Sequence, residues 1–251
     1  MRTERRAGAL GAGAPERGTE PLLAVRGLTK RYGAEWALRD AAFDVLAGEV
    51  LGLIGPNGAG KTTLFECLAG LLAADGGSVA WEGRPLTPRE RSRHVFYLPD
   101  GITPWGEQLV GEVLRFFARL SGGRLLPEVA EALGVEPLVA RRLSGLSKGE
   151  RKRVVLALGL SAPQPLLLLD EPFDGLDLRQ TREAAALLRS ERARGRTLFL
   201  SIHQLVDAAR VCDRFVLLSG GREAGTGDLA SLRERAALPE GSLEEVFLAL
   251  T

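Results

Sequence analysis

A run of glycines that ends in a lysine and two threonines is the segment of this sequence best suited to chemistry. It matches the pattern G-x-x-x-x-G-K-[ST] and comprises Gly55, Pro56, Asn57, Gly58, Ala59, Gly60, Lys61, Thr62 and Thr63. Glycines in such a loop let backbone N–H groups surround phosphate oxygens, and the helix that follows adds partial positive charge. Lys61 can reach the β- and γ-phosphates and the Thr62 hydroxyl can bind Mg²⁺, whereas a purely structural turn would not need the lysine. The segment therefore predicts a site for ATP and Mg²⁺.

Two adjacent acidic residues, Asp170 and Glu171, follow the apolar run 166–169 later in the chain. Four consecutive leucines are typical of a central parallel strand that is buried on both faces. Acids at the carboxyl end of such a strand lie where ligands bind in open α/β sheets. We expect Asp170 to hold Mg²⁺ through water and Glu171 to be the base that polarises an attacking water. Acids often end strands, so this pair predicts nucleotide hydrolysis only together with the phosphate loop.

The elements that must position these residues alternate along the chain. A helix is expected over 62–72 and a helical region over 108–160. Strands are expected over 41–46, 50–54, 78–81, 95–98, 166–169, 197–201 and 215–218. This order predicts an α/β fold with a mostly parallel sheet and an all-helical lobe inserted in the middle.

Composition and charge limit the kinds of protein that this chain can be. Hydrophobic residues make up 45% of the 251 residues and the formal net charge is +1, so no overall field would gather nucleic acid or acidic lipid. The two cysteines provide no disulfide framework, and no apolar run is long enough to cross a bilayer. We expect a chain of the cytoplasm that does not itself cross a membrane. Residues 1–20 are predicted to be a disordered tail and residues 21–251 a single domain.

A third motif, Leu146-Ser147-Lys148-Gly149-Glu150, precedes the acidic pair. With the phosphate loop and the acids, it resembles the ATP-binding subunits of the ABC transporter family, from about Leu23 to the end of the chain. It is similar to the family signature LSGGQ, from which Lys148 and Glu150 depart. In that family the signature of one subunit closes over the γ-phosphate held by the other, which implies that Ser147 and Gly149 bind ATP. The same residues also predict a helix capped by Ser147, with Glu150 completing a capping box.

Three single residues match further positions of the family. Tyr32 resembles the aromatic residue that stacks on adenine, although a structural tyrosine would also fit here. His203 is similar to the switch histidine that contacts the γ-phosphate. Asp177 matches the aspartate of a loop that crosses the dimer interface, and it also suits a plain turn before a helix. The resemblance implies a P-loop NTPase core with a mostly parallel sheet, an antiparallel β subdomain and a helical subdomain over about 102–162.

Asp100 departs from the family pattern. It follows the expected strand 95–98, where most members carry a glutamine that touches Mg²⁺ and senses the membrane partner. A carboxylate is a harder Mg²⁺ ligand than an amide, and a third acid near Asp170 and Glu171 should raise the proton affinity of a neighbour. We expect Asp100 to reach the metal in the closed state; the alternative is a loop aspartate that points to solvent.

The function implied by the resemblance is that of a transport motor. A homodimer or heterodimer of such subunits would close around two MgATP and drive a separate membrane permease, from the cytoplasmic face of the cell membrane. The amphipathic segment 242–250 resembles the ending of motors in export-type systems. One alternative is a soluble ABC-type ATPase that acts on nucleic acid or ribosomes, and another is a non-hydrolysing nucleotide sensor. The arginine-rich stretch 179–196 suits the solvated face of a helix, so no nucleic acid is expected.

Overall fold

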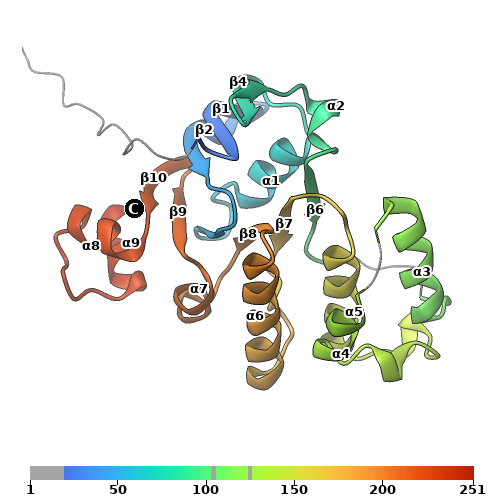
Figure 1. Ribbon diagram of the computed structural model, residues 1–251. Coiled ribbons are helices and arrows are strands. Elements are labelled where there is room, and N and C mark those ends of the chain that lie inside the picture. Colours follow the sequence, from blue (N-terminus) through green and yellow to red (C-terminus); the bar gives the residue numbers. More distant parts are fainter. Residues whose placement is uncertain (1–19, 103–105, 124–125) are drawn as a thin grey trace, which may run out of the picture.

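Two β-sheets enclose one helix, and most other helices lie on the far side of the larger sheet (Figure 1). The computed structural model describes residues 20–102, 106–123 and 126–251. The predicted disordered tail over 1–20 lies outside the described residues except for Glu20. The predicted architecture is confirmed: it comprises a mostly parallel sheet, an antiparallel sheet and a helical segment inserted between strands of the larger sheet.

The larger sheet has six strands in the order β10-β9-β3-β8-β7-β6. Five of them run parallel, and β10 pairs antiparallel with β9 at one edge. Their bounds are Val50–Ile54 (β3), Val95–Leu98 (β6), Leu166–Asp170 (β7), Thr197–Ser201 (β8), Arg214–Ser219 (β9) and Arg222–Gly227 (β10). The mostly parallel sheet expected from the sequence is therefore confirmed, while its strand order was not part of the expectation.

The leucine run of β7 is buried from both sides. Leu166 and Leu168 join the apolar core between the two sheets, and Leu167 and Leu169 join the core beneath the helices. Successive side chains of a strand point to opposite faces, so a strand covered on both faces needs an uninterrupted apolar run. Asp170 ends the strand at the carboxyl edge of the sheet, where the apolar run ends.

The smaller sheet is antiparallel, with the strand order β2-β1-β4-β5. Its strands are Leu23–Tyr32 (β1), Glu35–Val45 (β2), Gly76–Trp81 (β4) and Arg84–Pro85 (β5). It covers helix α1, Lys61–Ala69, which is followed later by the short α2, Pro88–Arg91. Helix α1 ends before the predicted residue 72 because Gly70 is left-handed (φ 77°) and its N–H bonds to the Cys67 carbonyl. Any Cβ at Gly70 would collide with the Pro88 carbonyl oxygen.

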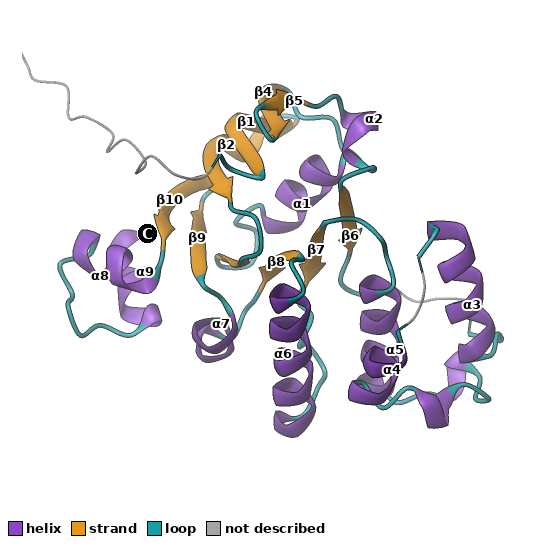
Figure 2. Ribbon diagram, in the orientation of Figure 1, coloured by secondary structure: helices purple, strands orange, loops and turns teal. Residues whose placement is uncertain are grey.

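The remaining helices lie beyond the larger sheet and beside its edges (Figure 2). Between β6 and β7 come α3 (Val110–Ser121), α4 (Pro127–Ala132), two 3-10 turns (Glu136–Leu138 and Leu143–Gly145) and α5 (Lys148–Leu160). After β7 come α6 (Leu178–Ala193), α7 (Leu205–Val211), α8 (Leu229–Arg235) and α9 (Leu243–Leu250). The division of the chain into one domain with a helical subdomain stays a prediction. Among the described residues, none of the helices has both the length and the apolar character needed to cross a bilayer.

Candidate nucleotide-binding and hydrolysis site

The phosphate loop connects β3 to α1 in a conformation that depends on glycine. Gly58 and Gly60 have φ of 79° and 103°, in the left-handed region that disfavours side chains. A Cβ at Gly60 would also collide with the carbonyl oxygen of Ala37 in β2. The loop therefore packs directly beneath the smaller sheet and opens the helix that begins at Lys61.

A pocket of about 310 Å³ lies against this loop at the carboxyl ends of the parallel strands. It joins the loop to both acids of the pair, to His203 and to Asp100. Its lining residues are Ala37, Pro56, Asn57, Gly58, Gly60, Lys61, Thr62, Thr63, Asp100, Asp170, Glu171 and His203. The structure thus brings together residues that are far apart in the sequence and that the sequence predicts to bind phosphate, bind a metal or activate water.

Lys61 is held inside the loop that precedes it. The residue is only 8% exposed, and its Nζ donates hydrogen bonds to the carbonyl oxygens of Gly55 (2.7 Å) and Pro56 (3.2 Å). Burial lowers the pKa of Lys61, and the nearby carboxylates of Glu171 and Asp170 act in the opposite direction. The ammonium group therefore lies at the centre of the loop, where phosphate oxygens could replace the carbonyl oxygens as its partners.

Asp170 accepts hydrogen bonds from three hydroxyl groups. Its Oδ2 accepts from Thr62 Oγ1 and from the phenol of Tyr97, each at 3.2 Å, and its Oδ1 accepts from Ser201 Oγ. Carboxylate and hydroxyl oxygens suit Mg²⁺, which prefers oxygen ligands. Several of its ligands are usually water molecules and nucleotide phosphate oxygens rather than protein groups. No cluster of three or more acidic, histidine or cysteine side chains that could hold a metal occurs in the part of the chain that the structure describes. This sparse oxygen set fits a Mg²⁺ that arrives with a nucleotide.

Glu171 and His203 contact each other at the pocket wall. The backbone N–H of His203 donates to Glu171 Oε2 at 3.1 Å, and its Nε2 lies 3.2 Å from Oε1. Burial raises the pKa of Glu171, His203 is the main influence that lowers it, and Asp170 adds to the increase. Glu171 also has a φ of 48°, an uncommon value for a residue with a side chain. A carboxylate with raised proton affinity, fixed beside a nucleotide pocket, is suited to accept a proton from water.

Asp100 lines the same pocket but pairs with the helical segment. Its Oδ1 lies 2.9 Å from Nζ of Lys152 in α5, and its side chain is 45% exposed. Asp100 is thus neither directed wholly to solvent nor bound to the other acids. Its predicted contact with the metal stays a prediction.

The motif before α5 caps that helix. Ser147 Oγ accepts from the N–H of Glu150 at 3.2 Å, and Glu150 Oε2 accepts from the N–H of Ser147 at 2.8 Å, which confirms the capping box. Asp177 likewise caps α6, since its Oδ1 accepts from the N–H of Gln180 at 2.8 Å. Within the described ranges, the residues that line the pocket do not include Ser147, Gly149 or Asp177.

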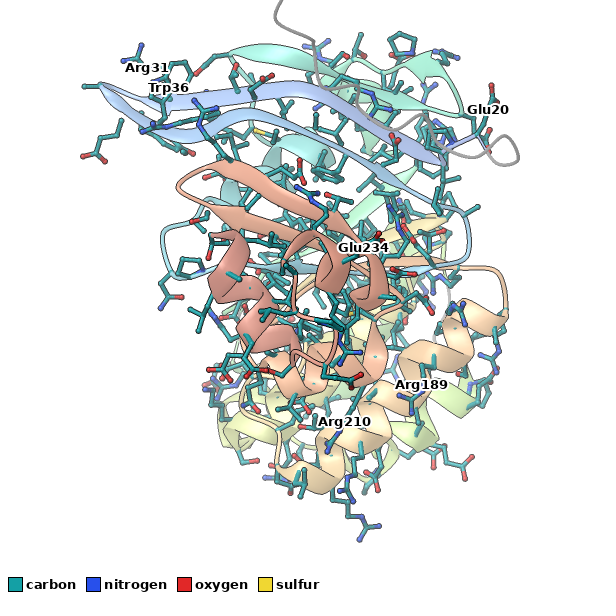
Figure 3. The ribbon with its side chains drawn as sticks, turned by 90° about the vertical axis from the view of Figure 1, so that its left-hand side faces the viewer. Glu20, Arg31, Trp36, Arg189, Arg210 and Glu234 are labelled. Atoms are coloured by element: carbon teal, nitrogen blue, oxygen red, sulfur yellow. The ribbon has the colours of Figure 1, made fainter. Side chains whose placement is uncertain are left out.

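Tyr32 lies at the end of β1 and is 53% exposed. It is not among the described residues that line the pocket, to which Ala37 of the adjacent β2 contributes instead. Figure 3 shows Arg31 and Trp36 at the outer end of the same β1–β2 hairpin, where the Arg31 guanidinium lies 4.6 Å from the centre of the Trp36 ring. The stacking of adenine on Tyr32 stays a prediction.

Two residues that the sequence analysis missed, Tyr97 and Ser201, bind the carboxylate of Asp170. Ser201 ends β8 at the same edge of the sheet as Asp170, with which it pairs in register. A polar residue at the end of an otherwise apolar strand was the available signal for Ser201. Tyr97 gave no such signal, because a tyrosine within an apolar strand is most simply a core residue.

Comparison with known proteins agrees with this geometry. The family model of the ABC transporter family matches residues 38–174. An uncharacterised ABC transporter ATP-binding protein of Methanocaldococcus jannaschii is 31% identical over 228 residues, covering 88% of this chain and 83% of that protein. A fluoroquinolones export ATP-binding protein of Mycobacterium tuberculosis is 39% identical over 219 residues (82% and 70% covered). A sulfate/thiosulfate import ATP-binding protein of Bordetella parapertussis is 35% identical over 228 residues, and the chain spans 64% of its length.

Solved structures show the same likeness. The ATP-binding subunit of an ABC transporter superimposes with a TM-score of 0.84 at 32% identity, covering 91% of this chain and 99% of that chain. A nucleotide-free ATP-binding cassette superimposes with a TM-score of 0.77 at 21% identity, a likeness in fold alone. The chain therefore belongs to the ATP-binding subunits of the ABC transporter family, whose ATP-binding domains are ATPases.

Proposed function

We propose that this chain is the ATP-hydrolysing motor of an ABC transporter, in which two such subunits, identical or different, close around two MgATP and drive a separate membrane permease. The observation that carries the proposal is the single pocket in which the phosphate loop meets Asp170, Glu171 and His203. A phosphate-binding loop, a metal-binding carboxylate and a fixed base are the parts that phosphoryl transfer to water needs.

Five side chains of the pocket, together with the backbone of the loop, carry out this mechanism. The loop N–H groups and Lys61 bind the phosphates, and Thr62 and Asp170 would hold Mg²⁺, which supplies positive charge to the phosphate oxygens. Glu171 orients the attacking water and takes up its proton, which its raised pKa favours. His203, whose Nε2 lies 3.2 Å from Glu171 Oε1, keeps that carboxylate in place and would contact the γ-phosphate.

The location of the signature supports a second subunit. Ser147 and Gly149 begin α5, and the described residues around the chain's own pocket do not include them. A helix N-terminus with a serine hydroxyl binds anions well, so these residues suit a phosphate that another subunit presents. Gly149 also packs closely on the loop of Asp177, since a Cβ there would lie 3.1 Å from the Gly175 carbonyl oxygen. We assign both segments to the dimer interface, at the cytoplasmic face of the membrane.

The direction of transport and the cargo are left to the permease in this proposal. Relatives named for import and for export align with the chain at similar identity, 35% and 39%. The export-type expectation, drawn from the closing segment that forms α9, therefore stays a prediction.

The variant E171Q tests the proposal. The amide keeps the shape of the side chain but cannot accept a proton, so hydrolysis should fall by about 10²- to 10⁴-fold while ATP still binds. Trapped ATP should then accumulate a dimer, measured by size-exclusion chromatography with and without ATP. The matched control is E183Q on the exposed face of α6, which should hydrolyse ATP as the wild type does. An E171Q chain that hydrolyses normally, or that stays monomeric with ATP, would contradict the proposal.

A further inference from the structure

Tyr97 is a buried tyrosine beside the metal-binding carboxylate. It lies in β6, the edge strand next to β7, and pairs in register with Leu168. The residue is 9% exposed, and its ring packs edge-on against Phe65 of α1 with 5.8 Å between ring centres. Packing alone would be satisfied by phenylalanine, yet the hydroxyl donates a hydrogen bond to Asp170 Oδ2 at 3.2 Å.

With the Tyr97 hydroxyl, Asp170 accepts hydrogen bonds from side chains on both neighbouring strands. Strand β7 lies between β8 and β6. Ser201 of β8 binds Oδ1, while Tyr97 of β6 binds Oδ2. Each carboxylate oxygen is therefore bound from one neighbouring strand, and rotation about the Cβ–Cγ bond would break at least one of these hydrogen bonds.

Tyr97 can act only as a donor in this contact. A carboxylate oxygen accepts hydrogen bonds, and the Tyr97 hydroxyl donates to Asp170 Oδ2. Thr62, the third donor, has lone pairs that a metal could occupy, whereas Tyr97 is set back in the core and does not line the described pocket.

We propose that Tyr97 is a positioning residue for Mg²⁺ binding: its hydroxyl holds Asp170 Oδ2 in the orientation that receives the metal with its nucleotide. This role depends on the proposed binding of Mg-nucleotide at Asp170. Groups that orient a metal ligand from behind commonly change metal affinity by 10- to 100-fold when removed. The metal-free affinity for nucleotide should not depend on Tyr97, because the phosphate loop and Lys61 provide it.

The experiment uses the full chain with Y97F, which keeps the ring and its packing and removes only the hydroxyl. Mn²⁺ replaces Mg²⁺ as a probe because it binds the same oxygen ligands and is visible by electron paramagnetic resonance. Mn²⁺ is titrated into chain loaded with ADP, and ADP affinity is measured separately by calorimetry in EDTA. The matched control is S161A, which removes another buried hydroxyl, one that donates to the Ala157 carbonyl oxygen away from the pocket.

We expect Y97F to weaken Mn²⁺ binding about tenfold, with ADP affinity in EDTA unchanged and S161A equal to wild type in both measurements. Equal Mn²⁺ affinity in Y97F and wild type would overturn the role of Tyr97 and leave the proposed function intact. A Y97F chain that loses ADP affinity equally with and without Mn²⁺ would also overturn it, since that is the result of a structural defect. Wild-type chain that binds no ADP under either condition would instead overturn the proposed function itself.

Discussion

The pocket at the carboxyl ends of β7 and β8 and the start of α5 hold their charged groups in different ways. In the pocket, Lys61 and Asp170 are only 8% and 7% exposed, and each is fixed by at least two hydrogen bonds. At the start of α5, the side chain of Lys148 pairs with that of Asp174 at 2.9 Å, and the two are 72% and 50% exposed. In the pocket, buried hydrogen bonds therefore hold the charged side chains in place. At the start of α5, solvent-exposed ion pairs hold them.

The exposed region contains the residues that depart from the family pattern. Lys148 pairs with Asp174, and Asp100 pairs with Lys152 one helical turn further along α5. Glu150 completes the capping box and also pairs with Arg141 at 2.6 Å. Each departing side chain thus has a partner within its own chain, so the departures are accommodated locally and leave the start of α5 formed.

Burial predicts how the two regions respond to change. A buried charge that loses its partner retains the full cost of desolvation, whereas exposed ion pairs contribute little and are screened by salt. Substitutions in the pocket should therefore change binding and turnover by orders of magnitude. Substitutions at the start of α5 should change binding and turnover by small factors.

The largest effect is expected from K61A. Lys61 would lose hydrogen bonds to the phosphates, each worth roughly 1.5–3 kcal/mol when charged, so ATP affinity should fall by about a hundredfold or more. Isothermal titration calorimetry with ATP measures this loss. The variant K61M keeps the apolar stem and should lose as much affinity as K61A, because the charge and not the packing is responsible. If both variants still bound ATP as tightly as the wild type, the phosphate loop would not be the ATP-binding site.

The next effect concerns the pH dependence of turnover. Glu171 must be ionised to accept a proton, so turnover should fall as pH decreases through its pKa. Burial raises that pKa, which places the fall at a higher pH than for an ordinary glutamate. His203 lowers the pKa of Glu171, so H203A should move the fall to a still higher pH and reduce maximal turnover by about tenfold or more. Turnover measured against pH for both chains checks this; a fall that moves to lower pH in H203A would exclude Glu171 as the titrating base.

The sequence predicted those parts of the site that depend on local pattern. The phosphate loop, the acids after β7 and His203 after β8 each follow a short apolar strand, and parallel strands bring their carboxyl ends to one edge. The capping box at Ser147 was equally local. These features are fixed within a few residues of the chain, so no knowledge of strand order was needed.

The contacts that escaped prediction join distant segments. Whether Tyr97 reaches Asp170 depends on β6 lying next to β7, and the order of strands is not written in any single strand. The pairing of Asp100 with Lys152 likewise depends on how the helical segment packs on the core. For Tyr32 the expectation concerned contact with a ligand, which the pattern of the chain alone does not test.

Asp100 belongs to both regions, and its substitution compares them directly. If Asp100 contacts the metal in the closed state, D100A should raise the Mg²⁺ concentration for half-maximal turnover by about fivefold, as loss of one outer ligand would. K152A removes its partner and should shift that concentration less than twofold. Turnover titrated with MgCl₂ distinguishes them. Equal shifts in the two variants would mean that Asp100 acts only through its ion pair with α5. No change in D100A would mean that Asp100 does not contact the metal.

The smallest effect is expected from K148A and D174A. Both side chains are largely exposed, so the pair is screened by salt, and turnover should change less than twofold in either variant or in the double variant. Turnover at low and high salt measures this. A loss of tenfold or more in K148A, with D174A unaffected, would mean that the ammonium group acts beyond its partner. Lys148 would then contribute charge to the nucleotide of the opposing subunit, and the start of α5 would be as sensitive to change as the pocket.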